Sequence, residues 1–333
     1  MCRVLIPPPE GRGGRHSKRG VRGSRWSPSA LASALSVCAC FSRNFNPIFI
    51  SVNQLTQQPP LFPIDKSFAQ AVPATTLAAL AKNFWLLVPS AFYYEVFDGE
   101  AKKRPSALKG LDQFRRVDLG TLLQCETKTG NPIEEADSGP LSFNPVVLSP
   151  DWMLTDELSA VMQDYKTNVV DPALVFWNEI ISTRQVAGFT TEEIQAVSGT
   201  ESEFTNLCAI LRDRTRIRRA ASIIGFPFSD LLTESWFHFR HYQASLLNAL
   251  ILLRRYPDPQ TPRDQLKLEH DVHDMEYLTL GLITGHLATA ETSKHFSNFS
   301  MKWRFGLLRP DGELITPDSV TALLQTYVSR VSH

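Results

Sequence analysis

The sequence contains few cysteines, no excess of charge of either sign and no long apolar run. Its five cysteines are too few and too scattered for a disulfide framework, which favours a reducing compartment. Lysine and arginine number 34, as do aspartate and glutamate, so no overall field attracts the chain to nucleic acid or membrane. No apolar stretch approaches the roughly 18 residues that cross a bilayer. We therefore expect a soluble, cytoplasmic protein without a membrane partner.

Several common catalytic and cofactor motifs are also missing. The chain has no Ser-His-Asp nucleophile elbow, no glycine-rich loop that would cradle a phosphate and no dinucleotide-binding fingerprint. Cys38 and Cys40 are spaced as CxC, but no second pair completes a zinc site. The composition, with 43% hydrophobic and 20% charged residues, is that of an ordinary globular protein.

Residues 1–55 differ in composition from the rest of the chain. The stretch GRGGRHSKRGVRGSRWS is basic and rich in glycine, and Glu10 is the only acid before Asp65. Such a segment buries too little apolar surface to fold, so we expect a disordered basic extension. A misassigned start is an alternative, because no methionine occurs between Met1 and Met153. A secretory or transit segment is a further alternative, because an apolar, serine-containing run follows the basic one.

Strand and helix patterns alternate where the folded part begins. Two short apolar runs, 61–65 and 84–90, are each followed by a helical pattern, 75–83 and 91–103. This order predicts a parallel sheet covered by helices. Residues 104–260, by contrast, read mainly as helices with polar, proline- and glycine-rich connections.

The stretch HDVHDMEYLTLGLITGHLATAET, residues 270–292, places acids and histidines at one end of an apolar segment. We expect a helix that begins with Thr261 as N-cap and Pro262 in its first turn and ends before Gly285. The letters HLATAE that follow predict a short strand. An acid therefore closes this strand, as an acid closes the first one.

Acidic side chains recur where the predicted parallel strands end. Asp65 closes the first strand, Glu95 lies in the helix after the second, and Glu291 closes the last. Asp271 and Asp274 are three residues apart, so they share one helix face. Ligands bind at the carboxyl edge of open parallel sheets, so we expect these acids to meet in one crevice.

A cluster of carboxylates favours a bound divalent cation. Like charges within a few ångströms repel one another, and a hard cation offsets that repulsion. Mg²⁺ and Mn²⁺ prefer oxygen ligands and keep several waters, one of which can be activated to attack a phosphodiester. Each acid alone is equally typical of a cap, a turn or a solvated helix face, so only their joint placement indicates a metal site.

The blocks FPIDKSFAQAVP, LLVPSAFYYEVF and HDMEYLTLGLITGHLATAETSKHF resemble the conserved blocks of PIN-domain proteins, which are metal-dependent ribonucleases. The family's first block is a strand ending in Asp with Ser or Thr two residues later, matched by Asp65 and Ser67. The family's second acid is a Glu on the helix after the second strand, matched by Glu95. Its third is an Asp in a D-x-E-Y-like helix start, matched by Asp274.

The fourth family acid is usually an Asp in a T-x-D pattern. Here the pattern reads Thr289, Ala290, Glu291, which is a departure by one methylene. The resemblance covers about residues 60–103 and 262–300. It implies a three-layer α/β/α domain over residues 56–333, with a small, mostly parallel sheet and a large helical insertion at 104–260.

The resemblance also implies an activity and a set of site residues. The activity is endoribonuclease cleavage of single-stranded RNA with Mg²⁺ or Mn²⁺ as cofactor. We expect Asp65, Glu95, Asp274 and Glu291 to be catalytic and to hold the metal, with Asp271 as an outer-sphere helper. A protein inhibitor and a second copy of the chain are candidate partners beside RNA. The residues we assign to substrate binding are Ser67, Thr289, Lys102, Lys103, Arg212, Arg216 and Arg219.

The arginine assignment depends on the stretch LRDRTRIRR, which carries five arginines against one acid. Arg212, Arg216 and Arg219 lie nearest one helix face, and arginine forms bidentate bonds with phosphate oxygens. A solvated helix face with local ion pairs is the alternative. Lys102 and Lys103 follow Glu95 by one to two helical turns and are placed to guide RNA toward the acids.

Two other functions remain open at this point. A catalytically silent PIN-like module that binds RNA or protein is consistent with Glu291 in place of Asp and with the long insertion. The letters HDVHD, together with His238 and His241 spaced as HxxH, also resemble HD-type metal phosphohydrolases. That second alternative requires an all-helical fold, so a parallel sheet would exclude it.

Overall fold

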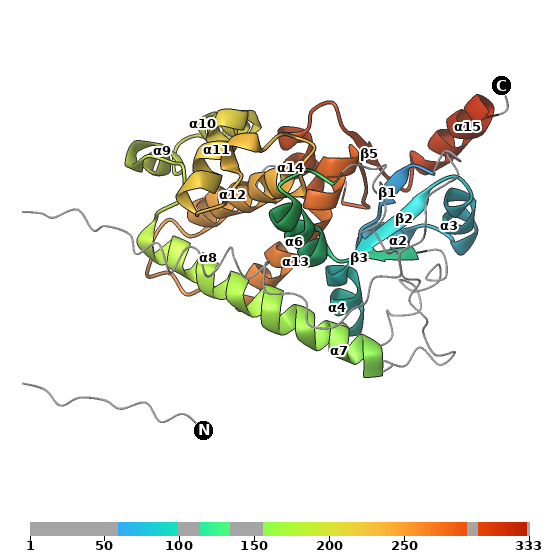
Figure 1. Ribbon diagram of the computed structural model, residues 1–333, viewed down its shortest axis with the longest axis horizontal. Coiled ribbons are helices and arrows are strands. Elements are labelled where there is room, and N and C mark those ends of the chain that lie inside the picture. Colours follow the sequence, from blue (N-terminus) through green and yellow to red (C-terminus); the bar gives the residue numbers. More distant parts are fainter. Residues whose placement is uncertain (1–58, 99–113, 134–155, 292–298, 332–333) are drawn as a thin grey trace, which may run out of the picture.

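The computed structural model describes residues 59–98, 114–133, 156–291 and 299–331. Over these ranges the protein has a mixed α/β fold that is mostly helical and contains a small parallel sheet (Figure 1). The predictions for residues 1–55 and for Lys102 and Lys103 fall outside the described residues. Within the described ranges, no helix combines the length and apolar character needed to cross a bilayer.

Three strands form the first sheet, in the order β1, β2, β3. They are β1 (Leu61–Pro63), β2 (Trp85–Pro89) and β3 (Phe114–Val117), and both pairings are parallel. The predicted alternation of short strands and helices is thereby confirmed for β1 and β2. The third strand was not predicted, because its sequence FRRV has two arginines and no clear alternation. It lies inside the segment 104–260 that we expected to be helical.

A second parallel pair lies directly beside β1. It consists of β4 (His286–Ala288) and β5 (Glu313–Ile315). Ile64 forms a parallel bridge with Ala288, and the backbone N–H of Asp65 donates to the carbonyl of Ala288 at 3.0 Å. The carboxyl ends of β1 and β4 are therefore neighbours, although more than 220 residues separate them along the chain.

Both faces of β2 are buried, as the pleat of a covered parallel strand requires. Leu86 and Val88 point into the main hydrophobic core, whereas Leu87 belongs to a second cluster. That second cluster contains Leu280 from helix α13 and Leu122 from helix α6. Helices therefore lie against the sheet on both sides.

Short helices follow the strands of the first sheet. Figure 1 shows α3 and α4 close to β1 and β2. The aromatic ring of Phe92 in α4 packs edge-on against that of Phe114 in β3, with 5.5 Å between the ring centroids. The bounds of these helices are α2 (Lys66–Ala71), α3 (Ala74–Ala81), α4 (Ser90–Asp98) and α6 (Leu119–Thr129).

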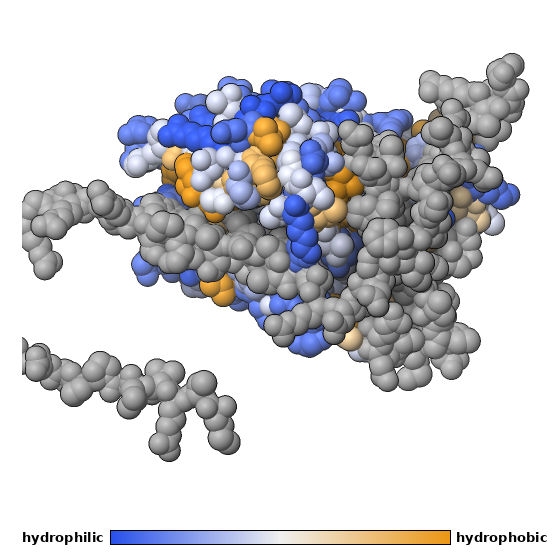
Figure 2. All heavy atoms as spheres, viewed as in Figure 1, coloured by the Kyte–Doolittle hydropathy of each residue, from blue (hydrophilic) through white to orange (hydrophobic). Residues whose placement is uncertain are grey.

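The chain between β3 and α13 is dominated by helices. Figure 1 shows α7 and α8 as one continuous rod, joined by a π-helical turn, and shows α9, α10 and α11 at the end of the molecule away from the strands. Figure 2 shows mainly hydrophilic side chains over that end. The bounds are α7 (Asp156–Tyr165), η4 (Lys166–Val170), α8 (Asp171–Thr183), α9 (Thr191–Ala196), α10 (Glu201–Ala209), η5 (Ile210–Arg212), α11 (Arg214–Ile223), η6 (Ser229–Leu231) and α12 (Phe237–Arg255).

Helix α12 is the central helix of the core, since every residue from Phe237 to Leu253 is buried. Its N-cap residue, Trp236, offers no capping side chain. The buried carboxylate of Glu126 caps it instead, accepting from the backbone N–H groups of Phe237 at 2.7 Å and His238 at 2.9 Å. A negative charge at a helix N-terminus is favourable, so this contact ties α6 to α12.

Helix α13 (Gln265–Thr284) packs against α12, β1 and β4 and carries the acids of the HDVHD stretch. Gly285 ends it with φ of 83°, as predicted. The predicted start at Thr261 is wrong: Asp264 is the N-cap and accepts from the N–H of Lys267 at 3.1 Å. Two further helices complete the described chain, α14 (Met301–Leu308) and α15 (Val320–Val331).

Candidate active site

Asp65 lies where β1 ends and α2 begins. Its side chain is the N-cap of α2 and accepts from the N–H of Phe68 at 2.7 Å. The hydroxyl of Thr289 donates to it at 2.5 Å, and the hydroxyl of Ser67 lies 2.8 Å from both carboxylate oxygens. Desolvation raises the pKa of Asp65 to about 7, although these hydrogen bonds favour the ionised form.

The structure brings Ser67 and Thr289 together with Asp65. Their hydroxyl oxygens lie 3.3 Å apart, and the N–H of Ala290 donates to Ser67 at 2.9 Å. Both hydroxyls therefore serve to fix the Asp65 carboxylate between two strands. We assigned them to substrate binding; the contacts in the structure are with the acid.

Glu95 lies in α4 after the second strand. The phenol of Tyr277 donates to it at 2.9 Å, the ammonium of Lys66 lies 3.5 Å away, and Nδ1 of His270 lies 3.8 Å away. Burial alone would raise the pKa of Glu95, but the bond to His270 and the charge of Lys66 outweigh it, so the pKa lies below its ordinary value. Glu95 is thus held ionised by partners from α2 and α13.

Asp274 projects from α13 and remains reachable, with 30% of its side chain exposed. Desolvation raises the pKa of Asp274 to about 7, and the negative charges of Glu291, Asp271 and Glu95 raise it further. The guanidinium of Arg304, 3.4 Å away, acts in the opposite direction. Asp274 is therefore linked by charge to Glu291, Asp271 and Glu95, and the common crevice remains a prediction.

Glu291 follows β4 and is exposed. Its carboxylate accepts from the N–H of Met301 at 3.1 Å, in the first turn of α14. Its negative charge raises the pKa of both Asp65 and Asp274. Glu291 is therefore part of the same cluster, in spite of the extra methylene that distinguishes it from Asp.

Asp271 lies buried between two arginines. Its carboxylate is paired with the guanidinium groups of Arg255 and of Arg304, the latter at 2.8 Å, and the residue is 3% exposed. These charges hold the pKa of Asp271 below its ordinary value against the effect of burial. In the structure Asp271 is a buried counter-ion of two arginines, one of which also lies beside Asp274, and its outer-sphere role remains a prediction.

The donor set fits a hard divalent cation in kind, because all four acids offer carboxylate oxygens. Within the described residues, however, no three His, Cys, Asp or Glu side chains are already arranged as a metal-binding group. The carboxylate oxygens of Asp65, Glu95 and Asp274 already accept hydrogen bonds or form ion pairs within the chain. The site is therefore a carboxylate cluster with internal partners.

Sequence reasoning missed most of those partners. Lys66 directly follows Asp65, and Tyr277 completes the D-x-E-Y-like pattern, so the resemblance itself pointed to their neighbourhood. Arg304 lies beyond the quoted blocks, and no local pattern indicates that it reaches Asp274. Glu276 was also missed: it accepts from the N–H of Ala91 at 3.1 Å, and burial raises its pKa to about 8.

The arginines of η5 and α11 lie apart from the acid cluster. Figure 1 shows α11 at the end of the molecule away from the strands. Arg216 forms a two-pronged ion pair with Glu193, at 2.7 and 2.9 Å, and also donates to the carbonyl of Gly188. Arg212 and Arg219 are exposed. The structure therefore gives Arg216 an internal partner and does not bring these arginines to the acids.

The histidines do not form the site of a helical metal phosphohydrolase. The parallel sheet contradicts the all-helical fold which that alternative requires. His238 binds Glu126 at 2.8 Å, and His273 binds the phenol of Tyr165 at 3.0 Å. Burial lowers the pKa of both His241 and His273 to about 4, so these rings are neutral core groups.

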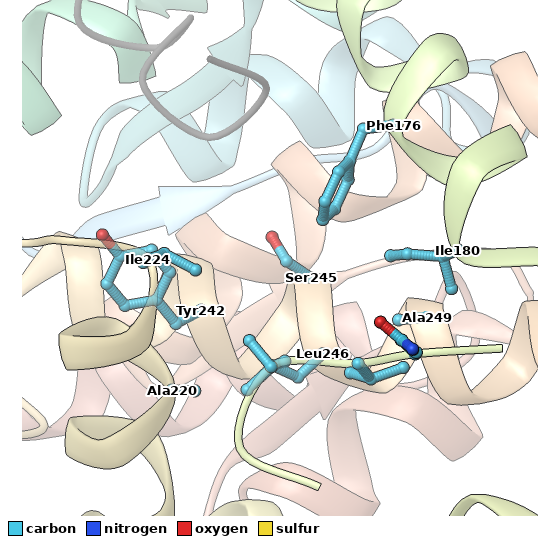
Figure 3. Close-up of a pocket in the computed structure, with 11 residues that line it drawn as sticks. Phe176, Ile180, Ala220, Ile224, Tyr242, Ser245, Leu246 and Ala249 are labelled. Atoms are coloured by element: carbon cyan, nitrogen blue, oxygen red, sulfur yellow. The ribbon is translucent and has the colours of Figure 1, made fainter. Parts of the chain in front are cut away.

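Two hollows lie elsewhere on the described surface. Figure 3 shows the first, lined by Phe176 and Ile180 from α8 and by Tyr242 and Ala249 from α12, with a cavity volume of about 30 Å³. That volume holds a water or two, not a substrate. The second, about 310 Å³, borders the loop of residues 184–191. None of the acids lines either hollow.

We compared the chain with protein-family models, with curated proteins and with solved structures, and found no match.

Proposed function

We propose that the chain is a PIN-like endoribonuclease that cleaves single-stranded RNA with Mg²⁺ or Mn²⁺. One observation supports this most: pairwise charge effects link four acids, and two of them follow the carboxyl ends of the neighbouring strands β1 and β4, the edge at which ligands of open sheets bind. The four acids are Asp65, Glu95, Asp274 and Glu291.

The fold part of the proposal is a three-layer α/β/α domain. Parallel pairing within β1–β2–β3, the bridge from Ile64 to Ala288 and the burial of both faces of β2 support it. The helices from α6 to α12 then form the large helical insertion, with β3 added to the edge of the sheet.

The four acids would hold the cation, which when bound activates a water toward a phosphodiester and offsets the developing charge. The chain's own residues prepare the acids. Thr289 and Ser67 fix the carboxylate of Asp65, and Tyr277 fixes that of Glu95. Lys66, with 27% of its side chain exposed beside Glu95, offers a positive charge to a phosphate at the mouth of the site.

The test is Mn²⁺-dependent cleavage of a labelled single-stranded RNA by the full chain. Asp65→Asn should abolish cleavage, and because Asn is also a good N-cap, α2 should remain folded. Asp230→Asn, an exposed acid far along the chain, serves as the matched control and should cleave normally. Equal cleavage by the Asp65 variant and the wild type would contradict the proposal.

A second candidate is a catalytically silent PIN-like module that binds RNA or protein. The observation that favours it is the internal pairing of the acids: Arg304 lies 3.4 Å from Asp274, and Lys66 lies 3.5 Å from Glu95. If the module is catalytically silent, neither the wild type nor either variant should cleave the RNA in this assay. The wild type should still retain the RNA on a filter.

A further inference from the structure

A hollow of about 310 Å³ lies beside the loop that joins α8 to α9, at the end of the molecule away from the strands (Figure 1). Pockets that hold small ligands begin at roughly 300 Å³. The acids of the carboxylate cluster do not line this hollow, so it is a separate candidate for a binding site. The residues that line it are 184–191, Ile194 and Ile223.

Part of the lining is apolar. Val186 and Ile194 are buried, at 6% and 5% exposed, whereas Ile223 at the end of α11 is 53% exposed. Ile223 is one of four large apolar side chains that are exposed among the described residues. An apolar group bound in the hollow would remove this side chain from water, which is favourable.

The backbone of residues 185–188 offers hydrogen-bond donors. Their four N–H groups donate to no acceptor among the described residues. Two of their carbonyls already accept, that of Val186 from the N–H of Phe189 at 3.1 Å and that of Gly188 from Arg216 at 2.5 Å. Free donors therefore outnumber free acceptors, and successive N–H groups in a turn favour an anion.

Among the described residues that line the hollow, Arg184 alone is charged. Its Nη1 donates to the carbonyls of Tyr256 and Pro257, both at 3.0 Å, and these contacts fix it at the end of α12. It forms no ion pair with an acid of the described residues. The nearby carboxylate of Glu193 is already paired with Arg216 at 2.7 Å. The lining thus carries one positive charge without a fixed counter-ion, and a monoanion balances it.

We propose that this hollow binds a small monocarboxylate whose apolar body lies against Val186, Ile194 and Ile223. The carboxylate accepts from Arg184 and from the N–H groups of residues 185–188. A carboxylate matches the single guanidinium in charge, whereas a phosphate monoester carries close to two negative charges at neutral pH. The site is independent of the carboxylate cluster, so either can fail without the other.

The test is the binding of 4-fluorobenzoate to the full chain, followed by fluorine NMR, with fluorobenzene as the uncharged comparison. The wild type should bind 4-fluorobenzoate saturably and at least about tenfold more tightly than fluorobenzene, because hydrogen bonds to a charged group are the stronger ones. Ile223→Glu should weaken binding by at least about tenfold, since it places a second negative charge beside the ligand. Leu231→Glu is the matched control: Leu231 is 55% exposed and does not line the hollow, so this variant should bind as the wild type does.

Arg184→Gln tests the charge and should remove the preference for 4-fluorobenzoate over fluorobenzene. Arg184 also binds the end of α12, so circular dichroism checks that this variant is folded, and Ile223→Glu tests the site without it. Equal affinity of the wild type for the two probes would overturn the assignment to an anion. Wild-type affinity in Ile223→Glu would place the probe elsewhere and overturn the site. No saturation of the wild type by about 10 mM 4-fluorobenzoate would overturn it as well.

Discussion

The hydroxyl of Thr289 donates a 2.5 Å hydrogen bond to the carboxylate of Asp65, joining two strand ends that lie 224 residues apart in the chain. Both residues are buried. Because the pKa of Asp65 is raised to about 7, this hydrogen bond contributes about 1.5–3 kcal/mol above that pH, where the acid is charged, and about 0.5–1.5 kcal/mol below it. This contact therefore does two things: it holds β4 beside β1, and it orients the acid on which the proposed site depends.

The first prediction concerns that contact. Thr289→Val keeps the shape of the side chain and removes the donor, so we expect the free energy of unfolding to fall by about 2 kcal/mol. Urea denaturation measures it. Thr183→Val is the control, because that exposed hydroxyl binds only a carbonyl one turn back in its own helix, and it should cost less than about 0.5 kcal/mol. Equal losses in the two variants would contradict the account.

The second prediction is a pH dependence at Glu276. Burial raises the pKa of this carboxyl from 4.5 to about 8, so the folded state binds its proton more tightly than the unfolded state. That contribution to stability is complete below about pH 4.5 and is lost as the pH rises through 8. Relative to Glu276→Gln, the wild type should lose a few kcal/mol between pH 4.5 and 8.5, since each pKa unit corresponds to about 1.4 kcal/mol.

Denaturation of both proteins across that pH range, with EDTA present, checks the second prediction. Groups that titrate in both proteins contribute equally to both free energies of unfolding, so their effect cancels when one is subtracted from the other. A difference that stays constant with pH would mean that Glu276 is ionised in the folded protein throughout the range.

The third prediction concerns Asn248 in α12. The residue is 2% exposed, and neither atom of its amide has a hydrogen-bond partner among the described residues. Asn248→Leu should therefore raise the free energy of unfolding by about 1–2 kcal/mol. Gln243→Leu, in the same helix, is the control: Gln243 binds Arg240 and the carbonyl of Leu211, so its loss should destabilise the protein. A loss of stability in both variants would show that Asn248 has a partner after all.

The fourth prediction separates the arginines of η5 and α11. Arg216→Gln should lower the free energy of unfolding by about 1–2 kcal/mol, because it breaks the part-buried pair with Glu193 and the hydrogen bond to the carbonyl of Gly188. Arg212→Gln and Arg219→Gln should leave stability unchanged and weaken RNA binding, with a smaller salt dependence. Unchanged RNA affinity in the last two variants would identify α11 as a solvated helix face.

Local sequence signals predicted the parts of the fold that local chemistry determines. Asp65 at the end of a strand, Gly285 at the end of a helix and the alternation of β1 and β2 with helices follow from turn, cap and pattern preferences within a few residues. Helix α13 has Asp264 and not Thr261 as its N-cap; both residue types are good N-caps, and the predicted start was three residues too early.

The parts that were missed depend on long-range contacts. Arg304 reaches Asp271 across 33 positions, and Glu126 caps α12 across 111. Among the described residues, strand β3 pairs only with β2 at the edge of the sheet, a position that tolerates its two arginines. For none of these residues does the neighbouring sequence predict the distant residue that it contacts. The acids could be predicted because the hydrophobic pattern shows where strands end. Their arginine partners could not, because those arginines come from distant parts of the chain.

The central claim is that four acids form one catalytic cluster, and single-residue variants of all four test it most directly. The measurement is the rate of Mn²⁺-dependent cleavage of a labelled single-stranded RNA by Asp65→Asn, Glu95→Gln, Asp274→Asn and Glu291→Gln beside the wild type. We predict that each variant loses at least about a hundredfold in rate, comparable with the loss of other transition-state charge-stabilising groups. Wild-type rates in any two of them would contradict the account.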